Sequence, residues 1–284
     1  MQENRPSLTA RRVAMSRAAH QLFDHPTVLT DPVALAILGP DGEQQLRSRR
    51  GRFLTTLSRH LRAFLVARSR LAEDALAEAV TRDVRQYVIL GAGLDTFAYR
   101  NPYPATRLRV FEVDHPATQA WKRELLAAAG MMLPEGLSFV PVDFERQSLP
   151  EALGAAGFQP GERTFFSWLG VTMYLTREVV LDTLRYIAHS LPYGSGIVFD
   201  YAAPPRKVSL ARRLLYGYLV RRVARAGEPF KSFFVPAALE REMRTFGYSR
   251  LEDFGAAELN ARYFRERADR LRVSGPAHVM NVRL

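Results

Sequence analysis

The chain has 284 residues, of which 47% are hydrophobic and 24% are charged. This composition is ordinary for a globular protein, and the length allows one large domain with a well-buried core. The chain contains no cysteine, which excludes a disulfide scaffold, a thiolate metal site and a cysteine nucleophile. We predict no metal site.

The formal net charge is +11, although only three of the 40 basic residues are lysines, namely Lys122, Lys207 and Lys231. A basic balance favours acidic partners. The arginines are spread along the chain without the aromatic motifs of RNA-binding domains, so a nucleic-acid partner is disfavoured. No apolar run reaches the roughly 18 residues that span a bilayer, and the first thirty residues lack the features of a secretory signal. We therefore predict a cytoplasmic protein that acts on a small molecule.

The first 80 residues have the periodicity of helices. Apolar residues keep near-helical spacing from Leu8 until Pro26 and Pro32 interrupt the pattern. A second helical stretch runs from about Arg47 to Val80 with a period near 3.6. We predict that residues 1–80 form a helical extension or lid beside a core of residues 81–284.

The core alternates between two kinds of segment. Short apolar runs rich in β-formers occupy residues 86–90, 107–113, 137–142, 163–168 and 196–200, and helical stretches occupy residues 116–129, 148–156 and 177–191. This alternation predicts a doubly wound α/β fold with a parallel sheet. An insertion at residues 203–235, a helix at 236–246 and two late strands, at 248–254 and 277–283, complete the prediction.

A glycine turn, Gly91-Ala92-Gly93, follows the first predicted strand in VILGAGLDTFAYR, residues 88–100. Glycine lets the backbone approach a ligand closely, and the amino terminus of the next helix can bind an anion. The third glycine of a dinucleotide fingerprint is replaced by Thr96, which disfavours a nicotinamide cofactor. Asp95 and Thr96 also suit the role of helix caps.

Acids stand at the ends of the next two predicted strands. Glu112 and Asp114 end the second strand, two residues apart, and Asp143 follows the third, just before Phe144. A carboxylate about 20 residues after a glycine turn is placed to accept hydrogen bonds from a ribose. Because open α/β sheets bind ligands at their carboxyl edge, the turn and the acids are predicted to converge on one crevice.

The segments GAGLDTFAYR, VFEVDHPATQAWKRELL, PVDFERQSL and SWLGVTMYLT, in this order and spacing, resemble the leucine carboxyl methyltransferase family, in particular its bacterial branch of S-adenosylmethionine-dependent methyltransferases. TARRVAMSRAAHQL and DPVALAIL match the same branch. The resemblance covers most of residues 8–202. It implies a class I methyltransferase-type, Rossmann-like core and S-adenosylmethionine as the cofactor.

The resemblance also implies a set of cofactor-binding residues. Arg68 stands where the family has an arginine that grips the cofactor carboxylate, a group that a guanidinium can bind bidentately. Asp114 matches the ribose-binding acid. The other implied positions are the two glycines beside the methionine part and the pair beside the adenine: Gly91, Gly93, Asp143 and Phe144. Arg11 or Arg17 is a candidate for a second basic contact.

The chain departs from its relatives at Leu169, where many of them have a glutamate, so no role of that acid is carried over. Trp168 and Tyr174 are candidates to shape the pocket, although aromatic residues in such a segment also suit the core. Residues 203–230 form an arginine-rich amphipathic stretch that suits a substrate lid, a membrane-surface helix or a helix packed on the sheet.

Together these features predict a methyltransferase that modifies oxygen in a small molecule. A carboxylate acceptor needs no general base, whereas a hydroxyl acceptor benefits from one. None of the six histidines stands in a recognisable motif, and no catalytic residue is assigned. The alternatives are a nicotinamide-dependent oxidoreductase, a nucleic-acid-binding or RNA-modifying protein, and a carboxyl methyltransferase that acts on a protein tail.

Overall fold

The computed structural model describes residues 7–143, 147–204 and 230–284. Within them, seven strands form one sheet in the order β3-β2-β1-β4-β5-β7-β6. The strands are β1 (Gln86–Leu90), β2 (Arg109–Asp114), β3 (Leu137–Pro141), β4 (Thr164–Trp168), β5 (Gly196–Ala202), β6 (Arg250–Phe254) and β7 (Ala277–Arg283). The first five strands pair in parallel, whereas β7 runs antiparallel between β5 and β6. The predicted parallel sheet with two late strands is confirmed.

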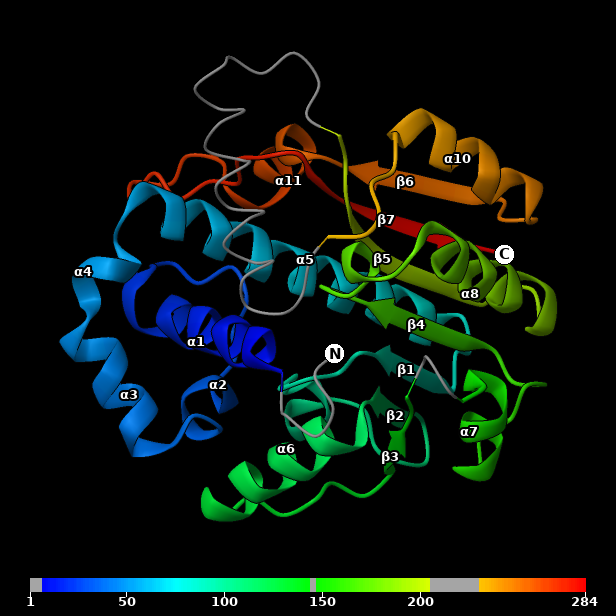
Figure 1. Cartoon of the computed structure of the whole chain (residues 1–284), viewed down its shortest axis with the longest axis horizontal. Helices are drawn as coiled ribbons and strands as arrows, with labels where there is room; N and C mark the ends of the chain where they lie inside the picture. Colours follow the sequence, from blue (N-terminus) through cyan, green and yellow to red (C-terminus); the bar gives the residue numbers. More distant parts are fainter. Residues whose placement is uncertain (1–6, 144–146, 205–229) are drawn as a thin grey trace.

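Helices cover both faces of the sheet (Figure 1). The helices that pack on it are α5 (Thr56–Thr81), α6 (Pro116–Ala128) and α11 (Ala256–Tyr263) on one face, and α7 (Leu149–Ala155), α8 (Arg177–Ser190) and α10 (Pro236–Thr245) on the other. Every residue of β1 and β4 is buried, as is typical of parallel strands between two helical layers. Trp168, at the end of β4, is fully buried.

Four helices precede α5 and lie beside one end of the sheet (Figure 1). They are α1 (Leu8–Phe23), α2 (Val33–Ala36), α3 (Gly39–Ser48) and α4 (Arg50–Phe53). α1 packs on α5, α2 and α3, and its buried Met15, Ala18 and Ala19 form a small core with Leu46.

The structure corrects several sequence-based element boundaries. The prediction of a single helical stretch from Arg47 to Val80 is wrong, because the helix is interrupted before Thr55. The side-chain oxygen of Thr55 caps the start of α5 by accepting from Ser58 N. The short helices α2 and α11 were not predicted. Most of the predicted insertion at residues 203–235, with its amphipathic stretch, lies outside the described residues. None of the described helices combines the length and hydropathy of a membrane-spanning segment.

Candidate functional site

A cavity of about 280 Å³ opens at the carboxyl edge of the parallel strands. This volume is just below the roughly 300–1,000 Å³ of typical ligand pockets. The cavity is lined by residues that follow β1, β2, β3 and β4, and by one side each of α1 and α5. It brings together five of the six predicted site residues, Arg68, Gly91, Gly93, Asp114 and Asp143. The sixth, Phe144, lies outside the described residues.

The glycine turn needs glycine for two structural reasons. Gly91 and Gly93 have φ angles of 66° and 51°, in the left-handed region that disfavours side chains. A Cβ on Gly91 would also lie 2.3 Å from Cγ2 of Val171, and one on Gly93 would lie 3.1 Å from Cβ of Ala10. Glycine at this turn therefore lets the loop after β4 and helix α1 pack closely around the cavity.

The turn does not lead into an α-helix, so the predicted helix amino terminus is wrong. Instead a short 3₁₀ helix, η1 (Phe97–Arg100), follows it. Pro102 and Pro104 come directly after η1 and prevent its extension. The predicted cap role holds for Asp95, whose Oδ1 accepts from Phe97 N at 2.8 Å, whereas Thr96 makes no cap hydrogen bond.

Asp114 joins the end of β2 to the glycine turn. Its Oδ2 accepts from Gly93 N at 2.5 Å and its Oδ1 accepts from His115 N at 2.7 Å. Burial raises the pKa of Asp114, and these two backbone donors oppose the rise. His115 in turn accepts the hydrogen of Ala117 N on Nδ1, which caps α6 at Pro116. The carboxylate is thus fixed at the cavity wall.

Glu112, two residues before Asp114 on β2, has a different role. It is fully buried, and its Oε2 accepts from Nζ of Lys122 at 2.6 Å. The same ammonium donates to the carbonyl oxygen of Asp95 at 2.6 Å. Burial raises the pKa of Glu112 to about 7, although Lys122 lowers it. Glu112 therefore holds Lys122 against the backbone of Asp95 and does not line the cavity.

Arg17 ties helix α1 to the turn. The residue is only 3% exposed, and its guanidinium donates to Asp31 at 2.6 Å, to Asp95 at 2.9 Å and to Thr96 at 2.7 Å. Of the two arginines considered for a second basic contact, Arg17 lines the cavity and Arg11 does not. This network joins residues about 80 positions apart in the chain, so no local motif could have revealed it.

Arg68 reaches the cavity from α5. Its NH1 donates to Oδ2 of Asp200, at the end of β5, at 2.5 Å. Its Nε is buried and has no hydrogen-bond partner among the described residues. Leu169 and Tyr174 also line the cavity, as the sequence suggested for Tyr174, whereas Trp168 belongs to the core.

The residues around the cavity fit S-adenosylmethionine. Arg68 keeps guanidinium donors that Asp200 does not use, as recognition of a carboxylate requires. Each oxygen of Asp114 accepts one backbone hydrogen bond, which leaves lone pairs for sugar hydroxyls. Apolar residues, including Ile89 and Leu94, complete a wall suited to a nucleoside.

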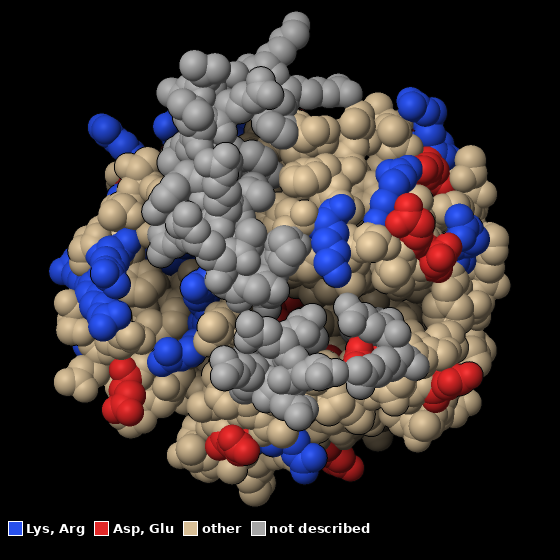
Figure 2. All heavy atoms as spheres, in the orientation of Figure 1, with Lys and Arg blue, Asp and Glu red and all other residues tan. Residues whose placement is uncertain are grey.

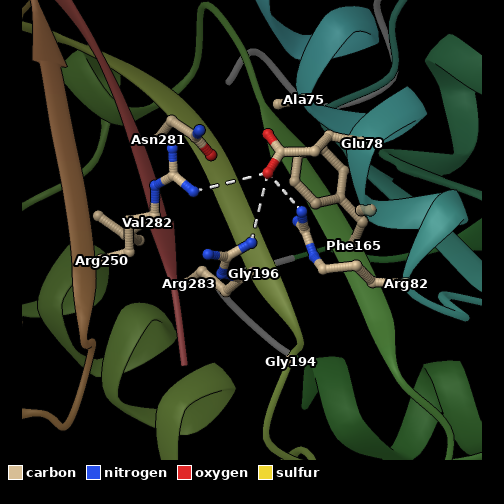
Figure 3. A pocket seen from close by; sticks show the side chains of 11 residues that line it. Ala75, Glu78, Arg82, Phe165, Gly194, Gly196, Arg250, Asn281, Val282 and Arg283 are labelled. Carbon is tan, nitrogen blue, oxygen red and sulfur yellow. Dashed lines mark hydrogen bonds and ion pairs between the residues drawn. The ribbon is translucent and has the colours of Figure 1, made fainter.

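A second, much smaller pocket lies at the opposite edge of the sheet, where the parallel strands begin (Figure 3). Its volume of about 10 Å³ has room for about one water molecule. Glu78 points at three guanidiniums, accepting a hydrogen bond from Arg82 and lying 3.6 Å from Arg250 and 3.5 Å from Arg283 (Figure 3). The carboxylate itself fills the position that an external anion would take.

On the face in Figure 2, the Lys and Arg residues that the structure describes lie in separate groups among acidic and uncharged residues. Many arginines instead pair with acids nearby in the sequence, such as Arg47 with Glu43 and Arg244 with Glu240. Residues 205–229, which contain seven basic residues and one acidic residue, lie outside the described residues.

Comparisons with known proteins agree with this geometry. The family model described as leucine carboxyl methyltransferase matches residues 10–188. The chain is 32% identical over 301 aligned residues, 99% of each protein, to YktD of Bacillus subtilis (strain 168), which is named as an S-adenosyl-L-methionine-dependent methyltransferase.

Two solved structures share the fold. One, named as a methyltransferase from Thermobifida fusca YX, aligns with a TM-score of 0.56 at 17% identity and covers 99% of this chain and 96% of that one. The other, a DUF574 family protein from Streptomyces avermitilis MA-4680, aligns with a TM-score of 0.53 at 16% identity over 96% of each chain.

Proposed function

We propose that this chain, which belongs to the leucine carboxyl methyltransferase family and is an S-adenosylmethionine-dependent methyltransferase, methylates an oxygen atom of a small-molecule acceptor. The acceptor oxygen is a carboxylate or a hydroxyl, and the chemistry of the cavity favours the carboxylate. The alternative prediction of a nicotinamide-dependent oxidoreductase is set aside, because the chain belongs to a methyltransferase family. The observation that carries it is the single cavity shared by the glycine turn, Arg68 and two strand-end acids.

Within this proposal the chain's own residues bind and orient the cofactor, which supplies a methyl group activated by its sulfonium sulfur. Arg68 binds the carboxylate of the methionine part beside Gly91 and Gly93. Asp114 accepts from the ribose hydroxyls. Asp143 lies on the adenine side, with Phe144 as its predicted partner. Residues 1–80 are proposed to serve as a lid, because α1 lines the cavity.

Three of the four carboxylates that line the cavity, Glu73, Asp95 and Asp114, favour an acceptor that ionises without help. Glu73 is paired with Arg100, and Asp95 accepts from both Arg17 and Phe97 N. Asp114 accepts from two backbone N–H groups at 2.5 and 2.7 Å. Carboxylates that hold such donors are poor general bases, because protonation would break the bonds.

The other polar groups in the wall give the same result. His115 accepts a backbone hydrogen on Nδ1, so a neutral ring carries its proton on Nε2 and offers no base there. Tyr87 donates to Ser167 at 2.8 Å, and burial raises its pKa far above the usual value. A carboxylate acceptor, ionised at neutral pH, needs none of them. Catalysis then comes from alignment of the reactants.

The side chain of Lys231 is suited to orient an acidic acceptor. Lys231 is exposed, lines the cavity, and is placed by its backbone N–H, which donates to Met173 O at 2.7 Å. Its ammonium can draw a carboxylate toward the opening by charge attraction.

The proposal is tested with S-adenosylmethionine that carries tritium on the methyl group and with panels of small carboxylic acids, phenols and amines. We expect label in a product that releases volatile methanol on mild alkaline treatment, the behaviour of a methyl ester. Alkali-stable label on a hydroxyl acceptor would keep O-methylation but reject the carboxylate. Label on nitrogen, sulfur or carbon would refute the proposal. The Arg68→Met variant serves as the cofactor-binding control.

A further inference from the structure

We infer that Asp200 is a positioning residue that sets Arg68 and the loop after β4 in the orientation needed to bind the cofactor. Asp200 is fully buried at the carboxyl end of β5, and it is not among the residues that line the cavity. It therefore acts through its neighbours. The inference rests on the proposed role of Arg68 and is independent of the identity of the acceptor.

The two carboxylate oxygens of Asp200 hold different segments. Oδ2 accepts from NH1 of Arg68 at 2.5 Å, and Oδ1 accepts from Gly170 N at 2.6 Å. Both partners line the cavity, one from α5 and the other from the loop that follows β4. One buried charge thus fixes two parts of the wall whose positions differ by about a hundred residues in the chain.

The loop after β4 packs so closely against Arg68 that it restricts the orientation of the guanidinium. Gly170 has a φ of 78°, and a Cβ on it would lie 2.8 Å from NH2 of Arg68. The guanidinium therefore lies against the backbone of the loop, and rotation toward the loop is blocked. With NH1 held by Asp200, only the remaining donors can face a ligand.

Hydrogen bonds also connect Asp200 to the part of the cavity where Lys231 is proposed to orient the acceptor. The backbone oxygen of Asp200 accepts from the hydroxyl of Thr172 at 2.5 Å, and the backbone oxygen of Thr172 accepts from the hydroxyl of Ser232 at 3.0 Å. Ser232 follows Lys231, which lines the cavity. A shift of Asp200 would therefore reach both the proposed cofactor contact and the proposed acceptor contact.

The test measures binding of S-adenosylhomocysteine by calorimetry to Asp200→Asn, Arg68→Met and the double variant. Asparagine keeps an acceptor for Gly170 N but removes the charge that holds Arg68. We expect Asp200→Asn to raise the dissociation constant at least about tenfold, in line with the loss of a charged hydrogen bond. The double variant should bind no more weakly than Arg68→Met, because Asp200 acts through Arg68.

A second ligand separates positioning from general damage. 5′-Methylthioadenosine has the nucleoside and the sulfur but lacks the amino-acid carboxylate, so its affinity should be unchanged in Asp200→Asn. An equal loss for both ligands would overturn the inference. Asp253→Asn is the matched control, since Asp253 lies on β6, bonds Tyr201 and His278, and does not line the cavity.

The remaining outcomes are also decisive. If Arg68→Met weakens S-adenosylhomocysteine binding and Asp200→Asn does not, the positioning role is wrong while the proposed site stands. If Arg68→Met has no effect, both are wrong. If Asp200→Asn does not fold, Gly170→Ala is the second variant, because its added Cβ would displace the guanidinium of Arg68 while the carboxylate of Asp200 is retained. It should give a similar tenfold loss, and unchanged affinity would overturn the inference.

Discussion

The two edges of the sheet both carry charged groups but use them in opposite ways. At the carboxyl edge, Arg17 and Arg68 are buried, each is held by a carboxylate, and with partly buried acids they surround a cavity of about 280 Å³. At the amino edge, Glu78 and Arg250 are 46% and 50% exposed, and the pocket has room for about one water. A binding site is therefore indicated by charged groups that surround a cavity and keep some hydrogen-bonding capacity for a ligand, and not by the density of charge.

The largest expected effect is on the buried pair beneath the glycine turn. Lys122→Met removes the ammonium that faces Glu112 and should lower the free energy of unfolding at pH 8 by about 3–5 kcal/mol. Burial already raises the pKa of Glu112 to about 7, and loss of Lys122 raises it further. A carboxyl with a raised folded-state pKa stabilises the fold below its unfolded value near 4.5, and this contribution is lost as the pH rises through the folded pKa.

The deficit of Lys122→Met should therefore be larger at pH 8 than at pH 5.5, as measured by urea denaturation. The double variant Lys122→Met/Glu112→Gln is the control, because it carries neither charge and should recover much of the stability. A deficit that did not change with pH would contradict the account of Glu112.

The next effect concerns the turn itself. Gly91→Ala places a methyl group 2.3 Å from Cγ2 of Val171, at a φ that disfavours side chains. We expect a loss of about 1–3 kcal/mol of stability together with weaker S-adenosylhomocysteine binding, measured by thermal unfolding and calorimetry. Gly247→Ala is the control: its φ is 101° but nothing lies within 4 Å of an added Cβ, so only the backbone cost should appear. Equal effects on ligand binding would contradict the packing argument.

Asp114→Ala tests the proposed ribose contact at the same edge. Removal of the carboxylate should weaken S-adenosylhomocysteine binding several-fold, equivalent to about 1–2 kcal/mol, while the fold survives. Calorimetry gives the affinity and circular dichroism gives the fold. Unchanged affinity in a folded variant would remove Asp114 from the cofactor site.

The smallest effect is expected at the amino edge. Glu78→Gln removes the carboxylate shared by Arg82, Arg250 and Arg283, but the Glu78 side chain is 46% exposed, so stability should change by no more than about 1 kcal/mol. Because the pKa of Glu78 is lowered by these arginines against the effect of burial, the loss should be smaller at pH 3 than at pH 7. S-Adenosylhomocysteine affinity should not change. If it fell, the two edges would be coupled and the comparison would fail.

Much of the fold could be predicted from periodicity. Short apolar runs alternating with helices of 10–15 residues gave the five parallel strands within a few residues of their observed ends. The errors have local causes. The helical period continues across residues 47–80, but the chain turns at Leu54 and Thr55, where the Thr55 side chain caps a new helix more effectively than the old one continues. The length of the 3₁₀ helix after the glycine turn is limited by Pro102 and Pro104, whose effect the hydrophobic periodicity does not include.

The candidate site was only partly predictable. Strand-end acids such as Asp114 and Asp143 carry a positional signal, because parallel strands end at one edge. Arg68 carries none: in a long helix it looks like a surface residue, and only the family resemblance singled it out. Asp200 was read as the last residue of a strand, and its role depends on a contact 132 positions away. Such contacts are set by packing and leave no local pattern.

The burial of Trp168 gives the chain a built-in optical probe. Its indole is fully enclosed at the end of β4, its Nε1 has no hydrogen-bond partner among the described residues, and the next residue, Leu169, lines the cavity. The only other tryptophan is Trp121, on α6. Replacing Trp121 with phenylalanine would leave a single emitter beside the cavity, so that ligands could be titrated by intrinsic fluorescence without any attached label.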